Sequence, residues 1–116
     1  MKYMLLIAHD PTHLSGEEGQ KRIPDLIARH RALGAELAAS GLDWSGSQLQ
    51  PASTATTVRT DGDKQSLHDG PYAETREQLA GYYMIDVPDL DAALAWAKKI
   101  PMAGQGSVEV RPLIGM

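Results

Sequence analysis

The order of strand-like and helix-like segments limits this chain to few folds. Residues 2–8 form a short apolar run that is typical of a buried strand, and residues 81–87 and 106–113 have the same character. Two amphipathic stretches, each with apolar residues at three- and four-residue spacing, lie between these strands. Strands therefore alternate with helices along the chain, which favours an α+β sandwich.

The first helix is predicted to begin at Ser15 and to end at Gly41, a favoured residue just past a helix end. Because proline fits only the first turn of a helix, we expect a short opening turn and a restart at Pro24. The stripe of this helix contains Ile23, Leu26, Ile27, His30, Leu33 and Leu37.

Between this helix and the strand at 81–87, residues 42–50 alternate loosely and indicate a further strand. Residues 54–60 and 65–68 are predicted to pair as a hairpin across the turn Asp61-Gly62-Asp63. The second helix is predicted to follow an N-cap at Asp89, with Leu90, Ala93, Leu94, Ala97 and Ile100 on its apolar stripe. The whole order predicts a ferredoxin-like βαβ–βαβ sandwich with an inserted β-hairpin, as one domain over residues 1–116.

Composition excludes several classes of function. The net charge is −4 and no basic run exceeds a pair, so we expect no nucleic-acid binding. The chain has no cysteine, which removes disulfides, thiol nucleophiles and cysteine metal sites. His9, Asp10 and His13 share a loop, but the fourth candidate, His68, lies on the hairpin, so we predict no metal site and no cofactor.

No stretch of the chain approaches the roughly 20 apolar residues of a membrane span. The apolar run at the N-terminus is short and meets His9-Asp10-Pro11 rather than a cleavage site of small residues. We therefore predict a cytoplasmic protein with no membrane association.

The segment from Asp69 to Leu79 reads DGPYAETREQL and resembles a known family signature. It is similar to the DGPF-A-E-T-K-E motif of the YCII-related (DGPF) proteins, with Tyr72 for the usual Phe and Arg76 for the usual Lys. The likeness extends over essentially the whole chain, including the MKYMLLI start, GYYMI at 81–85, DLDAAL at 89–94 and GSVEVRP at 106–112. It implies the dimeric α/β-barrel group, in which two sheets pack face to face.

An independent argument also favours a homodimer. With both helices on one face of the sheet, the other face is left open, and a bare apolar face is costly for a monomer. We expect residues of that face among Leu5, Ile7, Tyr83, Ile85, Val108 and Val110. Residues 81–87 and 108–110 should then lie near the two-fold axis.

His30 is the strongest single candidate for chemistry, because it lies on the apolar stripe of the first helix and points toward the sheet. An imidazole there can act as a general base when a carboxylate orients it, and Asp69, Glu74 and then Asp10 are the acids we expect near it. The alternative is a structural histidine that donates to a backbone carbonyl. The resemblance adds weight to the first, since some YCII-type proteins are thought to carry a helix histidine paired with an aspartate.

The Asp69–Glu77 segment also has two interpretations. Asp69-Gly70-Pro71 is turn chemistry, and Thr75 with Gln78 fits the capping box of a short helical turn. That explanation leaves out the phenol of Tyr72, the carboxylate of Glu74 and the guanidinium of Arg76, which together suit either a polar ligand or a dimer interface.

Two functions follow. In the first, the protein is a small-molecule enzyme with His30, Asp69 and Glu74 as catalytic residues and with Tyr72, Arg76 and Asp10 binding a small polar organic substrate. In the second, it is a non-catalytic dimeric module for ligand binding or regulation. The resemblance connects the second to sigma-factor signalling, because genes of the family often lie beside those of such factors.

Overall fold

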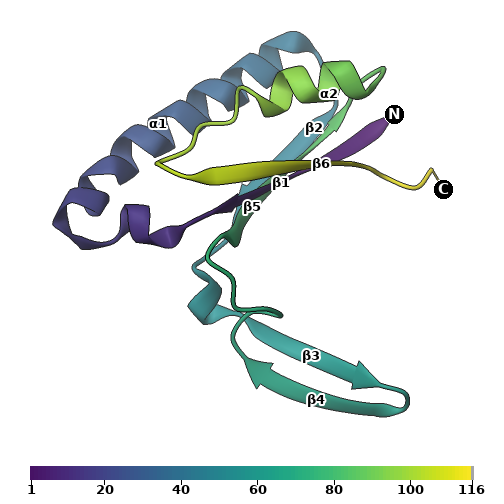
Figure 1. Ribbon diagram of the computed structural model, residues 1–116. Helices are drawn as coiled ribbons and strands as arrows, with labels where there is room; N and C mark the ends of the chain where they lie inside the picture. Colours follow the sequence, from purple (N-terminus) through teal and green to yellow (C-terminus); the bar gives the residue numbers. More distant parts are fainter. Residues whose placement is uncertain (116) are drawn as a thin grey trace.

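Four antiparallel strands form the central sheet in the order β2–β5–β1–β6. Their bounds are Lys2–His9 for β1, Trp44–Gln48 for β2, Gln78–Asp86 for β5 and Gly106–Pro112 for β6. The computed structural model describes residues 1–115 and shows both helices on one face of this sheet (Figure 1). The predicted α+β class, with two helices on one face of an antiparallel sheet, is confirmed.

The first helix, α1 (Gly16–Ser40), is continuous, so the predicted restart at Pro24 is wrong. Pro24 has no N–H to donate to the carbonyl of Gln20, four residues earlier. Both residues are exposed, so this carbonyl lies on the solvent side of the helix. Gly41 ends the helix as predicted, with a φ of 78° and its amide donating to the carbonyl of Ala38.

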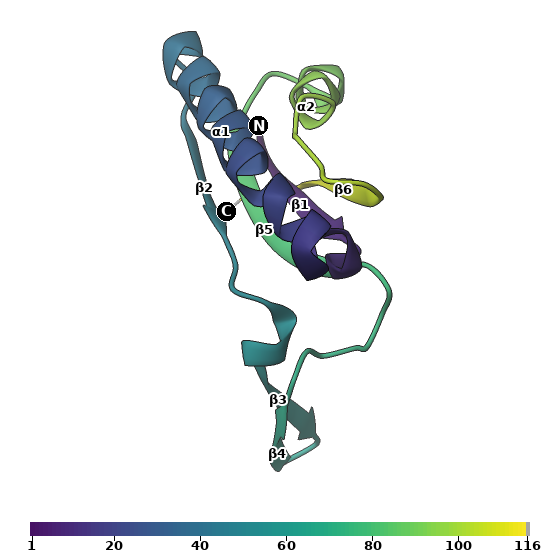
Figure 2. The ribbon, with the colours of Figure 1, turned by 90° about the vertical axis from the view of Figure 1, so that its left-hand side faces the viewer.

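The second helix, α2 (Leu90–Ala97), begins at the predicted N-cap, where the carboxylate of Asp89 accepts from the amide of Ala92 at 2.9 Å. It lies beside the C-terminal half of α1 only (Figure 2). The hydrophobic core sits under this double layer, and its largest fully buried side chains are Leu5, Leu37 and Ile85. The N-terminal half of α1 therefore faces the sheet alone.

The hairpin of β3 (Thr56–Asp61) and β4 (Lys64–Asp69) stands apart from the rest of the molecule as an arm (Figure 1). Its turn is the predicted Asp61-Gly62-Asp63, in which Gly62 has a φ of +63°. The radius of gyration is 16.0 Å, above the roughly 13 Å of a compact domain of this length. On the arm, Val58 pairs with Leu67, and these apolar side chains are 56% and 73% exposed.

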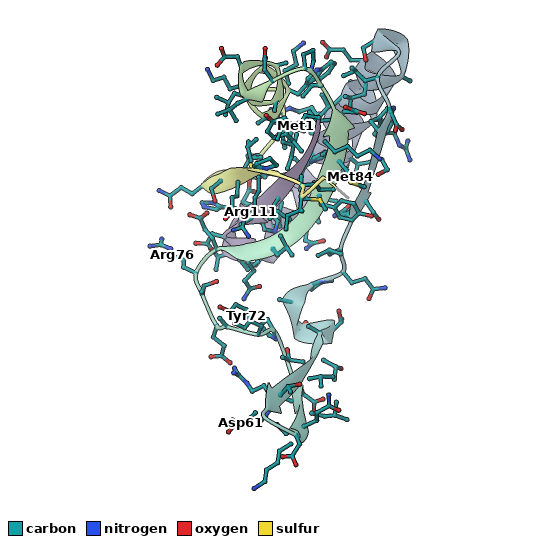
Figure 3. All side chains as sticks on the ribbon, turned by 90° about the vertical axis from the view of Figure 1, so that its right-hand side faces the viewer. Met1, Asp61, Tyr72, Arg76, Met84 and Arg111 are labelled. Atoms are coloured by element: carbon teal, nitrogen blue, oxygen red, sulfur yellow. The ribbon has the colours of Figure 1, made fainter. Side chains whose placement is uncertain are left out.

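The face of the sheet away from the helices is built from other residues than we predicted. Leu5 pairs with both Tyr83 and Val110, and this set belongs to the core or packs against it. Alternation puts their neighbours on the far side. We call this side the open face, and its apolar part consists of Met4, Leu6, Ala8, Leu79, Tyr82 and Met84. Figure 3 looks onto it, with Met84 near its centre and Arg111 toward its β6 edge.

Candidate functional site

A cavity of about 370 Å³ lies between the N-terminal half of α1 and the sheet. Its floor comes from β1, β2 and β5, its roof from α1, and one wall from the segment that follows α2. The volume is within the range of small-molecule sites.

The cavity exists because the apolar stripe of α1 covers two different environments. Leu33 and Leu37 pack into the hydrophobic core beneath both helices. Earlier on the same stripe, Ile23, Leu26 and His30 line the cavity instead, where α2 no longer reaches. One periodic pattern in the sequence thus provides both core and cavity.

His30 is hydrogen-bonded inside this cavity to a tyrosine of the sheet. Its Nδ1 lies 2.9 Å from the hydroxyl oxygen of Tyr83, and the two rings are stacked, with planes 14° apart. Trp44 also lines the cavity, with its ring centroid 6.2 Å from that of Tyr83. Within residues 1–115, Nε2 of His30 has no hydrogen-bond partner and is not fully buried.

The cavity changes the protonation of both groups. Burial lowers the pKa of His30 below its ordinary 6.5, and the positive charge of Arg29 lowers it further. Burial raises the pKa of the Tyr83 hydroxyl. At neutral pH the imidazole is therefore neutral and can accept a proton, while the phenol keeps its proton and can donate a hydrogen bond.

Two glycines and a bulge place Tyr83. A Cβ on Gly46 would lie 2.7 Å from Cδ1 of Tyr83 and 2.9 Å from the backbone oxygen of Tyr82. A Cβ on Gly81 would lie 2.8 Å from the carbonyl of Ser47. The register between β1 and β5 shifts beside Gly81, leaving Ala80 as an extra residue. β2 and β5 can approach closely here only because Gly46 and Gly81 have no side chains.

Asp10 and Arg76 come together at the cavity's end of the sheet, although 66 residues separate them. Asp10 is 4% exposed, and its Oδ2 accepts from Nε of Arg76 at 3.0 Å. Its Oδ1 accepts from the amide and the hydroxyl of Thr12, at 3.0 and 2.7 Å. The Thr12 hydrogen bonds, followed by that of Arg76, hold the pKa of Asp10 at about 2. This pair fixes the Asp69–Glu77 segment to the end of β1.

This pair gives a prediction about acid stability. A carboxyl whose folded-state pKa is depressed from 3.8 to about 2 stabilises the fold above pH 4, and the contribution is lost as pH falls through the folded value. Asp10→Asn should therefore lower the melting temperature by several degrees at pH 7, with the gap to wild type closing between pH 4 and 2. Asp69→Asn is the control. A constant gap at all pH values would contradict the proposed role of the charge.

The remaining predicted site residues lie outside the cavity. Asp69 ends β4, is exposed and makes no side-chain hydrogen bond among residues 1–115, so its carboxylate accepts no bond in the turn predicted at Asp69-Gly70-Pro71. Glu74 is exposed and Tyr72 is 79% exposed, on the segment that joins the arm to β5 (Figure 3). The short helical turn expected from Thr75 and Gln78 is absent there. Within one chain, neither Asp69 nor Glu74 lies beside His30.

Sequence reasoning missed the residues that accompany His30. Tyr83 was only one of six candidates for the open face, because the sequence pattern did not show on which side of its strand each residue lies. Arg31, Trp44 and Gly46, which also line the cavity, gave no signal of their own. The only usable hint for Tyr83 was its pairing across the sheet with Leu5, because residues that pair with the core residues of β1 lie on the core side of the sheet.

Among residues 1–115, no three His, Asp or Glu side chains group closely enough to hold a metal ion. No helix there combines the length and the apolarity needed to cross a bilayer.

Fold and site together define an α+β protein with a histidine–tyrosine pair in a cavity between helix and sheet. A sequence model described as the YCII-related domain matches residues 1–116. The chain is also similar to the uncharacterized protein R00369 of Rhizobium meliloti (strain 1021), at 36% identity over 118 residues, covering 97% of this chain and 92% of that protein. The chain belongs to the YCII-related domain family.

Proposed function

We propose that this protein binds a small organic molecule in the cavity and moves a proton on it, with His30 as the base and Tyr83 as its partner. The observation that carries the proposal is the 2.9 Å contact between His30 Nδ1 and the Tyr83 hydroxyl inside a cavity of about 370 Å³. Tyr83 takes the position beside His30 for which we expected a carboxylate.

The chemistry requires one of the two tautomers of the imidazole. If Nδ1–H donates to the phenol oxygen, Nε2 carries no proton and is able to take one. The Tyr83 hydrogen is then free to donate to a ligand oxygen that gains negative charge as the proton leaves. Proton removal next to a carbonyl group fits this arrangement, because the base and the donor face the same cavity.

Phenylpyruvate in D₂O provides a direct test, because it has an aromatic ring and an exchangeable C–H beside a carbonyl. We expect the wild-type protein to accelerate loss of that proton signal in NMR spectra, and His30→Asn to reduce the acceleration by roughly 10²-fold or more. Tyr83→Phe should retain part of it. Exchange no faster than in buffer, with the ligand bound in the cavity, would reject proton transfer.

We also propose that two copies pair through the open face as a homodimer, forming the dimeric barrel of two ferredoxin-like sheets. The strand order β2–β5–β1–β6 with two helices on one face supports the ferredoxin-like arrangement. The partly exposed Met4, Leu6 and Met84 support the pairing, because a monomer would leave an apolar surface in water. We further propose a cytoplasmic location.

The second candidate function is a non-catalytic dimeric module for ligand binding or regulation, acting in sigma-factor signalling. One observation favours it: the cavity lining within residues 1–115 contains no carboxylate that could orient His30. Binding of phenylpyruvate without accelerated exchange is the result that this candidate predicts.

A further inference from the structure

We propose that the cavity is specific for an organic anion, with an apolar ring-sized body in the cavity and a carboxylate or equivalent group bound by Arg31 at its mouth. The inference rests on the proposed function, because it names the class of molecule on which His30 and Tyr83 act.

The wall of the cavity is suited to an apolar body. Aliphatic and aromatic side chains form most of it, among them Ile7, Leu14, Leu26, Ile27, Trp44 and Met102. A cavity of about 370 Å³ accommodates a molecule of one or two rings. Burying such a ring gives affinity in proportion to the apolar area removed from water.

The charge of the lining points to an anion. Arg31 is the only charged side chain among the cavity-lining residues described, and none of them is an aspartate or glutamate. A cationic ligand would find no counter-ion there, and its charge would be repelled by Arg31. A carboxylate would instead meet a guanidinium whose planar fork of donors matches it.

Arg31 is also available for a ligand. Within residues 1–115 it makes no ion pair and no side-chain hydrogen bond, although Arg29, Arg76 and Arg111 each pair with a carboxylate. It follows His30 directly in α1, is exposed and lines the cavity, so its side chain borders both the cavity and the solvent. An anion held there keeps the apolar body beside the His30–Tyr83 pair.

A matched pair of probes tests the inference. 2-Naphthoate and 2-acetonaphthone share the same ring system and similar size, but only the first carries a charge. Titrations followed by the amide NMR signals of Gly46, Ala80 and Gly81 would report binding within the cavity. We expect 2-naphthoate to bind about threefold to tenfold more tightly than the ketone, with a smaller difference at high salt, because an exposed guanidinium is screened.

Arg31→Gln should remove this preference and leave the affinity for 2-acetonaphthone unchanged. Arg29→Gln is the matched control, since it removes a neighbouring positive charge that does not line the cavity. Equal affinities of the two probes for the wild-type protein, or equal losses of 2-naphthoate affinity in Arg31→Gln and Arg29→Gln, would overturn the anion site while leaving the cavity function intact. If neither probe shifts the amide NMR signals of these cavity residues, both the inference and the proposed function fail.

Discussion

Replacing Met84 with aspartate is expected to turn the proposed homodimer into a monomer. Met84 lies at the middle of the open face, where it pairs with Met4 of β1 and Ser45 of β2. In a two-fold interface the substitution is present in both copies, so two unpaired carboxylates enter a region from which water is excluded. Leaving a buried charge without a partner costs roughly 3–5 kcal/mol, which weakens association by more than about a hundredfold.

Sedimentation velocity across micromolar concentrations would measure this change. Leu90→Asp is the control, because Leu90 is an equally apolar, half-exposed residue at the start of α2 and away from the open face. We expect this control to stay dimeric. A wild-type protein that sediments as a monomer, or a Met84→Asp variant that remains a dimer, would contradict the assembly through the open face.

Gly46→Ala is expected to cost roughly 1–3 kcal/mol of folding free energy, because overpacking forces the surrounding structure to move. The new Cβ would meet both the ring of Tyr83 and the backbone of Tyr82, and a backbone atom within a paired strand cannot yield cheaply. The resulting displacement of Tyr83 should also lengthen the distance between its hydroxyl oxygen and Nδ1 of His30.

Gly34→Ala provides the matched control. Its Cβ would lie 3.6 Å from Trp44, an ordinary contact, and alanine is favoured over glycine inside a helix by up to about 1 kcal/mol. Chemical denaturation should therefore show a loss of stability for Gly46→Ala and none for Gly34→Ala. An unchanged His30 pKa in Gly46→Ala would contradict the claim that Gly46 positions Tyr83.

The sequence was sufficient for the order of the elements, because apolar periodicity and end signals are local. Gly41, Gly62 and Asp89 each act where the pattern placed them, at a helix end, a hairpin turn and an N-cap. Pro24 shows the limit of such rules. One missing hydrogen bond at an exposed position did not outweigh the packing of the stripe on either side of it.

The site was less predictable because it depends on which residues meet across the fold. His30 was found because its stripe position required it to face the sheet. Its partner was not, since Tyr83 reaches it from a strand 53 residues away. The charged segment at 69–77 drew attention by composition, yet its clearest contact within one chain is the Arg76–Asp10 pair, which ties the segment down beside the cavity.

The ring nitrogens of His30 provide the most direct test of the central claim, and long-range ¹H–¹⁵N NMR can read them. The chain has four histidines, and the His30→Asn variant would assign the signals. We predict a pKa below 6.5, a neutral ring at pH 7 with the proton on Nδ1 and none on Nε2, and a change in this tautomer in Tyr83→Phe. A ring that titrates at or above 6.5, or that carries its proton on Nε2 in both proteins, would show that His30 is not the base.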